Sequence, residues 1–181
     1  MPADPLAEEL APYLDVWRDG RRVGDVAAAL GAAQRAALQR VALVMFRSDA
    51  VQRGLVPAIL GHLESDHAVV PLRLAVRRID ERAFDRQYVT ELPLISTGLW
   101  LHHRIATADA TVFAVVTGPA PQGHSLATAL DELKGASSPA AETSAATLRA
   151  RFGRASSFHV VLHTSEDAGD FLQGTAAAFG W

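Results

Sequence analysis

The 181-residue sequence contains no cysteine. Disulfide bonds, thiolate metal ligands and a cysteine nucleophile are therefore excluded, and the absence favours the cytoplasm over a secreted compartment. Lysine is nearly absent too, because Lys134 is the single lysine among 17 basic residues, which are scattered along the chain. The formal net charge of −3 shows no basic excess, so nucleic acid is not an expected partner.

Long apolar runs are also missing. No stretch reaches the roughly 18 residues that a membrane-spanning helix needs, and the first four residues, MPAD, lack the basic start of a secretory signal. With 49% hydrophobic residues, the chain can still build the core of one compact domain. The sequence therefore predicts a cytoplasmic protein that has no membrane partner.

The pattern of the chain changes near residue 40. Alanine and leucine recur at helical spacing through residues 5–40, with a break at Asp19-Gly20, which predicts an N-terminal extension (residues 1–40) of two helices docked on the main domain (residues 41–181). In the main domain the order βαββαβ predicts a ferredoxin-like antiparallel sheet with surrounding helices, an α/β (α+β) fold. Strands are expected at 41–46, 67–79, 111–116 and just before His163, and helices at 50–63, 81–88, 97–104, 125–133 and 166–179.

Two segments carry motifs that can be compared with known families. Residues 46–54 read FRSDAVQRG, and residues 157–167 read SFHVVLHTSED, in which an apolar run ends on His163. These segments resemble the nucleoside diphosphate kinase family, whose first strand ends in KPDGVQRG and whose nucleophilic histidine begins the motif HGSDS. The resemblance covers roughly residues 41–180 and implies the same ferredoxin-like fold.

The resemblance implies that His163 is a nucleophile. An imidazole nitrogen can hold a phosphoryl group while one nucleotide leaves and another enters. Ser165 matches the family's serine near the nucleophile, and Tyr88, in RQYV, matches a tyrosine whose hydroxyl lies beside it. The alternatives are a structural histidine and an ordinary core tyrosine.

Phosphoryl transfer also needs positive charge and donors aimed at the phosphates, because its catalysis is mostly positioning and electrostatics. Residues 146–152, ATLRARF, match the family's GTIRGDF, which places Thr147 and Arg149 at the phosphates. Residues 135–140, GASSPA, match GETNPA and place Ser137 there, in a segment expected to form a ligand-binding loop. Arg47 stands where the family has a lysine, and the alternative for Arg149 is a solvated surface arginine.

Several nucleotide-binding positions depart from the family. The base-stacking phenylalanine aligns near Ile95, next to Leu99, so the base is expected to meet an apolar clamp rather than an aromatic one. The asparagine that contacts the sugar falls on Val160, whose side chain cannot form a hydrogen bond. The sequence therefore does not predict specific recognition of ribose.

Charges near the histidine depart as well. The family's second phosphate-binding arginine falls on Asp131, a reversal of charge, for which Lys134 could substitute from the next helical turn. The glutamate that orients the imidazole falls on Gly174, and Asp170, one turn away, is the nearest acidic alternative.

The histidine spacing does not predict a protein-ligated metal. His159 and His163 would lie about 13 Å apart on a strand, too far to share an ion. Mg²⁺ delivered with nucleotide phosphates fits the resemblance, since that ion needs few protein ligands.

Two functions of different class follow from the sequence. The first is a divergent nucleoside diphosphate kinase-like phosphotransferase, which moves a phosphoryl group from a nucleoside triphosphate, or a related phosphorylated small molecule, through a phosphohistidine. The alternative is a non-catalytic protein of the same fold that binds a nucleotide or a protein partner. Members of the family are usually oligomeric, so a homo-oligomer is expected.

Overall fold

The computed structural model describes residues 8, 10–11, 31–79, 109–136, 144–153 and 160–179, apart from the side chains of residues 34 and 35. The helices predicted at 81–88 and 97–104 lie outside these residues. Four of the predicted site residues also lie outside them: Tyr88, Ile95, Leu99 and Ser137.

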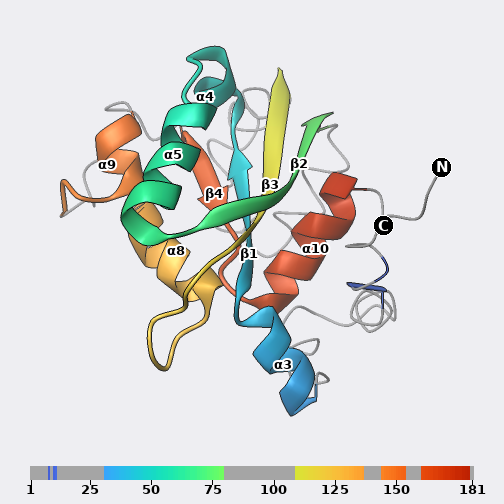
Figure 1. The fold of residues 1–181 in the computed structure, drawn as a ribbon. Helices are drawn as coiled ribbons and strands as arrows, with labels where there is room; N and C mark the ends of the chain where they lie inside the picture. Colours follow the sequence, from blue (N-terminus) through green and yellow to red (C-terminus); the bar gives the residue numbers. More distant parts are fainter. Residues whose placement is uncertain are drawn as a thin grey trace, which may run out of the picture.

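A four-stranded antiparallel sheet with the order β2-β3-β1-β4 forms the centre of the molecule (Figure 1). Strand β1 (Val41–Phe46) lies between β3 (Ala110–Thr117) and β4 (Leu162–Thr164), and β2 (Val70–Arg78) pairs with the far side of β3. This order and connectivity are ferredoxin-like, so the predicted fold class is confirmed.

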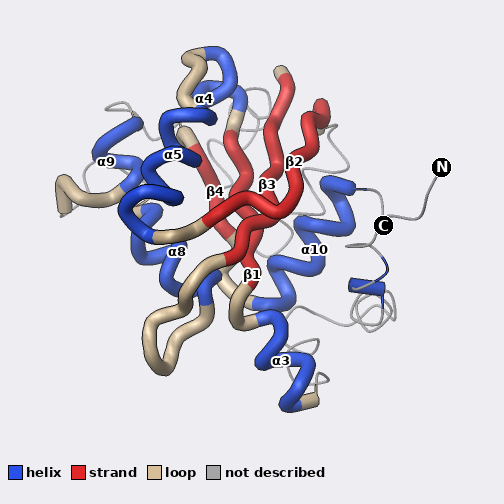
Figure 2. The backbone as a smooth tube through the Cα atoms, in the orientation of Figure 1, coloured by secondary structure: helices blue, strands red, loops and turns tan. Residues whose placement is uncertain are grey.

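Helices cover both faces of the sheet (Figure 2). Helices α5 (Val56–His67) and α8 (Leu126–Lys134) pack on one face, and α10 (Ala168–Phe179) packs on the other. Successive β1 residues alternate between the two cores, with Leu43 and Met45 toward α10 and Ala42, Val44 and Phe46 toward α5 and α8. Since both faces are buried, β1 reads as an unbroken apolar run.

The single helix predicted at 50–63 is wrong, because the chain forms two helices there. Helix α4 (Ser48–Gln52) ends before Gly54, whose φ of 65° lies in the left-handed region that glycine adopts without strain. Helix α5 then starts with Pro57 in its first turn, where the missing N–H costs no hydrogen bond.

The N-terminal extension contacts the body of the protein at two described points. Leu10 and Leu38, the last residue of α3 (Ala32–Leu38), are buried in the same apolar cluster as Phe113 and Phe171. The docking of two helices over residues 1–40 stays a prediction, because most of these residues lie outside the described part of the chain. None of the helices in the described part of the chain is both long and apolar enough to cross a membrane.

Two helix starts near the predicted site differ from the sequence prediction. Helix α9 (Leu148–Phe152) was not predicted, since five residues are too few to show a helical period. Helix α10 begins at Ala168 rather than at residue 166, because the Asp167 carboxylate accepts the N–H of Asp170, 2.9 Å away, as an N-cap does.

Candidate active site

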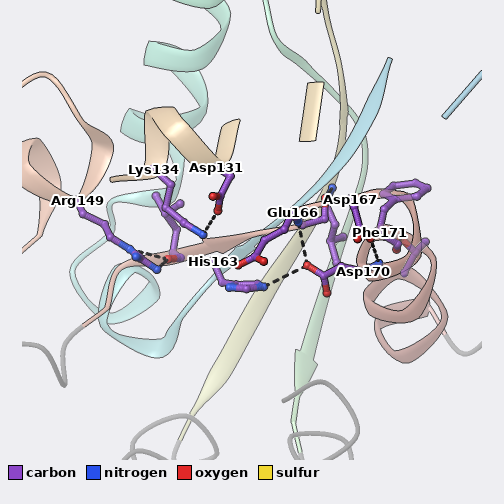
Figure 3. A network of polar contacts seen from close by, with 12 residues as sticks. Asp131, Lys134, Arg149, His163, Glu166, Asp167, Asp170 and Phe171 are labelled. Atoms are coloured by element: carbon purple, nitrogen blue, oxygen red, sulfur yellow. Dashed lines mark hydrogen bonds and ion pairs between the residues drawn. The ribbon is translucent and has the colours of Figure 1, made fainter. Parts of the chain in front are cut away.

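His163 lies in the middle of β4, where it pairs with Met45 of β1 and faces α10. Its side chain is 13% exposed, so the imidazole is largely buried but reachable from solvent. Its Nε2 atom lies 3.6 Å from Oδ2 of Asp170 (Figure 3). The strand thus presents the predicted nucleophile to a carboxylate from the first turn of α10.

Asp170 is itself held by backbone groups at the start of α10. Its Oδ2 accepts the N–H of Glu166 at 3.0 Å, and its own N–H donates to Oδ1 of Asp167 at 2.9 Å. This reciprocal pattern is a variant of the capping box, in which a third-position side chain reaches back to the residues before the helix. The carboxylate facing His163 therefore has little freedom to move.

Ser165 links the end of β4 to β1. Its side chain is buried, its Oγ accepts the N–H of Leu43 at 3.0 Å, and its own N–H donates to the Leu43 carbonyl at 2.9 Å. Both contacts fix the backbone two residues beyond His163. In this structure Ser165 therefore ties the end of β4 to β1.

Arg149 supports β4 through hydrogen bonds to the backbone before His163 (Figure 3). Its Nε and Nη2 donate to the carbonyl of Leu162 at 3.3 and 3.0 Å, and its Nη1 donates to the carbonyl of Gly135 at 3.0 Å. One guanidinium therefore ties α9 to the residue before His163 and to the end of α8. Charge-assisted hydrogen bonds of this kind are stronger than neutral ones.

The remaining described candidates lie at element ends. Thr147 caps α9, with its Oγ1 accepting the N–H of Ala150 at 3.2 Å and donating to the Ser144 carbonyl at 3.3 Å. Arg47 follows β1 and is a buried residue, 5% exposed, whose N–H donates to the Val161 carbonyl at 3.0 Å. Backbone pairing thus brings Arg47 to the strand of His163.

Asp131 and Lys134 form an ion pair on α8. The Lys134 side chain is 8% exposed. The lysine that could replace the family's second arginine is therefore buried against Asp131, the acidic residue that stands at the arginine's position.

Glu166 is a further carboxylate near Asp131, Asp170 and His163. Burial raises the pKa of Glu166 above its ordinary value of 4.5, and the Asp131 and Asp170 carboxylates raise it further, while Lys134 and His163 lower it. Because this pKa is raised in the folded protein, the stability that Glu166 contributes is complete below about pH 4.5 and is lost as the pH rises through the folded pKa.

We therefore expect Glu166→Gln to stabilise the protein at neutral pH and to leave its stability unchanged below about pH 4. The gain is small, since the side chain is partly exposed and its charge is screened. Urea midpoints of the two proteins at pH 4 and pH 7.5 measure it. Asp109→Asn is the matched control of opposite sign, because hydrogen bonds from Gln52 and from the Ala110 N–H lower the pKa of Asp109. A stability gain for Glu166→Gln that is the same at both pH values would contradict the argument.

The sequence prediction did not include Asp167 and Glu166 among the site residues. The signal that could have found them is the spacing of Asp167 and Asp170, which fits a helix N-cap and its third position. Within the described ranges, no group of three or more histidine, aspartate or glutamate residues could hold a metal ion.

Solved structures of other proteins share this fold. The nucleoside diphosphate kinase from Encephalitozoon cuniculi superposes with a TM-score of 0.66 at 15% identity, covering 78% of this chain and 90% of that one. The Aquifex aeolicus enzyme gives 0.65 at 16% identity, covering 77% and 94%. The Halobacterium salinarum enzyme in complex with CDP gives 0.66 at 23% identity, covering 77% and 86%.

Comparisons by sequence give no match. No protein-family model matches the chain, and no curated protein is similar enough to be matched. The relationship is therefore carried by the structure, at identities that establish the fold alone. The four-stranded sheet, its helices and these superpositions show that the chain has the nucleoside diphosphate kinase fold.

Proposed function

We propose that this protein is a divergent phosphotransferase that passes a phosphoryl group from a nucleoside triphosphate to an acceptor through a phosphohistidine at His163. The observation that carries the proposal is the position of His163. It is a largely buried, solvent-reachable imidazole on the last strand of a nucleoside diphosphate kinase fold, with Nε2 facing a fixed carboxylate. A histidine with these surroundings can act as a nucleophile.

The proposed reaction has two balanced displacements. A lone pair on the imidazole attacks the γ-phosphorus, the bond from phosphorus to the bridging oxygen breaks, and the nucleoside diphosphate leaves with the electron pair. An oxygen of the acceptor then attacks the same phosphorus, the phosphorus–nitrogen bond breaks, and the imidazole recovers its lone pair. No oxidant or further reactant is needed.

The proposed phosphate site includes three described residues: Arg47, Thr147 and Arg149. Four further residues of the proposed nucleotide and catalytic site lie outside the described part of the chain: Tyr88, Ile95, Leu99 and Ser137. Arg47 and Arg149 come from chain segments that bond to the residues just before His163. Mg²⁺ delivered with the nucleotide would neutralise phosphate charge, and that ion needs few protein ligands.

A second candidate function is favoured by the charge around the histidine. Lys134 is paired with Asp131, Glu166 adds another carboxylate, and the three described Arg149 bonds go to backbone carbonyls. This arrangement suits a non-catalytic protein of the same fold that binds a nucleotide or a protein partner.

Covalent labelling separates the two candidates. The protein is incubated with γ-labelled ATP and Mg²⁺, denatured, and tested for label that acid removes and alkali does not, as phosphohistidine requires. Such label supports the phosphotransferase. Its absence, with ATP binding still measurable by calorimetry, favours the non-catalytic alternative.

We also propose that the protein is a homo-oligomer that associates through β2. In the described part of the sheet β2 is an edge strand, and its large apolar side chains are exposed. Such an edge can pair with another strand. A two-fold axis at Leu74 would place Arg73 opposite Ala75, whereas an axis at Ala75 would place Arg73 opposite Arg77, and like charges directly opposite are unfavourable.

Leu74→Lys is therefore expected to convert the oligomer into a monomer. Leu74 is 51% exposed, so the substitution should cost the monomer little stability while placing like charges at the proposed two-fold axis. Light scattering coupled to gel filtration measures the mass. Gln122→Lys adds the same charge at another exposed residue and should leave the mass unchanged. An unmodified protein that is already a monomer at high micromolar concentration would contradict this proposal.

A further inference from the structure

A largely buried imidazole outside the candidate active site joins α5 to α9. His62 lies in the middle of α5, and its side chain is 9% exposed. Its Nδ1 atom lies 3.2 Å from Nη1 of Arg151, which belongs to α9 (Figure 1). The His62 ring also packs on Phe152, the last residue of α9, with 6.0 Å between the ring centroids. The His62 side chain is therefore part of the contact between the two helices.

The same nitrogen has a second partner of opposite character. Oδ2 of Asp66, one turn later on α5, lies 2.8 Å from Nδ1 of His62. A guanidinium can only donate a hydrogen bond, and an ionised carboxylate can only accept one. An imidazole nitrogen carries either a proton or a lone pair. Nδ1 of His62 therefore bonds to Arg151 or to Asp66, but not to both at once.

We propose that His62 is a pH-dependent latch between α5 and α9. In the neutral ring with its proton on Nε2, the lone pair on Nδ1 accepts the Arg151 N–H and ties α9 to α5. Uptake of a proton at Nδ1 turns that atom into a donor, so it bonds to Asp66 on its own helix, and the charged ring repels Arg151. Histidine is the side chain that usually changes charge between pH 5 and 8, and acidification in this range is the expected trigger.

Charged groups from both helices face the His62 ring. On α5 these are the Asp66 carboxylate and the His67 ring, whose centroid lies 5.3 Å away and whose plane is almost perpendicular. On α9 it is the Arg151 cation. Asp66 favours the protonated ring, whereas Arg151, and His67 when it is charged, favour the neutral ring. The state of His62 is therefore set by a balance between partners on two different helices.

Each partner keeps another contact when it loses the histidine. Oδ1 of Asp66 accepts the Ser65 hydroxyl at 2.6 Å. That hydrogen bond, with support from the neighbouring positive charges and against the effect of burial, lowers the pKa of Asp66 below its ordinary value of 3.8, so the carboxylate stays ionised throughout the range of the latch. The Cζ atom of Arg151 lies 5.5 Å from the centroid of the Phe152 ring, where a released guanidinium retains a favourable contact.

Helix α9 also carries the support of the strand that holds His163. Arg149, two residues before Arg151, donates to the carbonyls of Leu162 and Gly135. Release of Arg151 removes a tie from the helix that holds Leu162, the residue before His163. The effect of the latch on phosphoryl transfer rests on the proposed function, whereas the latch itself does not.

NMR titration of the histidine rings of the full-length protein tests the exchange of partners, with His62→Gln used to assign the signal. Arg151→Ala should raise the midpoint of the His62 titration and Asp66→Asn should lower it, because the first removes a cation and the second an anion. Glu64→Gln is the matched control, since it removes a carboxylate from an exposed residue of the same helix and should shift the midpoint less than Asp66→Asn does. A midpoint that stays in place in Arg151→Ala would overturn the proposal.

Amide hydrogen exchange of α9 tests its release. The N–H groups of Arg151 and Gly153 donate to the carbonyls of Thr147 and Arg149, and protection factors correct for the direct effect of pH on exchange. From pH 8 to pH 5.5 the protection should fall about twofold, as expected for the loss of a contact that involves an exposed side chain. The amides of α8, a helix without histidine, are the internal control and should show no such fall.

His62→Gln separates the latch from other effects of pH. Its amide oxygen can accept the Arg151 N–H at every pH, so the protection of α9 should be the same at pH 8 and pH 5.5. The competing explanation is a permanent network in which Asp66 holds both cations. That network predicts that the protection of α9 in the unmodified protein does not fall on acidification, and this result would overturn the latch. A fall that persists in His62→Gln would overturn it as well.

Labelling by γ-labelled ATP shows whether the latch acts on the site. The drop in labelling rate from pH 8 to pH 5.5 should be smaller in His62→Gln than in the unmodified protein. An equal drop in the two proteins would overturn the regulation of the site. Absence of label in the unmodified protein, together with the expected titration and exchange results, would overturn the proposed function and leave the latch intact.

Discussion

Replacing His163 with alanine is expected to abolish covalent labelling by γ-labelled ATP. The phosphoryl group is stored on the ring nitrogen, so a side chain without that nitrogen has nothing to form the bond with. The other described histidines lie elsewhere, His62 and His67 on α5 and His124 before α8. Helix α5 packs on the face of the sheet opposite α10, whereas His163 faces α10. Label is measured on the denatured protein, after separation from free nucleotide.

His124→Ala is the control for this experiment. His124 is exposed, and its removal should leave both labelling and folding unchanged. The melting temperature of His163→Ala shows whether the variant is folded, so that loss of label can be assigned to the missing ring. Equal labelling of His163→Ala would assign the phosphoryl group to another residue and remove the basis of the proposed mechanism.

Replacing Arg149 with alanine is expected to lower the free energy of unfolding by about 2 to 4 kcal/mol. Each hydrogen bond from a charged donor contributes about 1.5 to 3 kcal/mol, and the substitution leaves the carbonyls of Leu162 and Gly135 without these donors. Urea denaturation followed by fluorescence or circular dichroism measures the change. Labelling should fall as well, because the residue before His163 loses its brace.

Arg149→Lys separates bracing from simple charge. An ammonium keeps the positive charge but cannot reproduce the planar fork that reaches two carbonyls, so the lysine variant should be almost as unstable as the alanine variant. Arg151→Ala, on the same short helix, is the control. Arg151 is exposed, its described bond is to His62, and its loss should cost no more than about 0.5 kcal/mol. A lysine variant with the stability of the unmodified protein would show that the fork is not required.

The parts of the fold that the sequence predicts well are those with a strong local pattern. Strands β1 and β3 are apolar runs rich in valine, and α8 has a serine N-cap, Ser125, whose Oγ accepts the N–H of Thr128. The boundary between α4 and α5 lies at Gly54, whose positive φ of 65° ends the first helix and is not visible in the hydrophobic pattern. Helix α9 was missed because the signal of a five-residue helix is its cap rather than its period.

The motifs predict candidate site residues, but they do not predict the contacts that those residues make. The motif around His163 predicts the strand and its histidine, and Asp170, the acidic residue nearest to position 174 in the sequence, lies 3.6 Å from the imidazole. The use of Arg149 as a brace for two carbonyls depends on how α8, α9 and β4 meet. Such contacts form between residues that are distant in sequence, and no local pattern records them. The pairing of Lys134 with Asp131, by contrast, follows from their spacing of three on one helix.

The link between Leu43 and Ser165 has a consequence for the order of folding. It joins residues 122 positions apart, and β4, which carries the histidine, pairs with β1 from the other end of the domain. Contacts of such long range form late, because the chain must first give up the entropy of a large loop. A newly made chain therefore has no partial version of this site. The histidine gains its carboxylate, its braced carbonyl and its strand partner when the last strand closes the sheet.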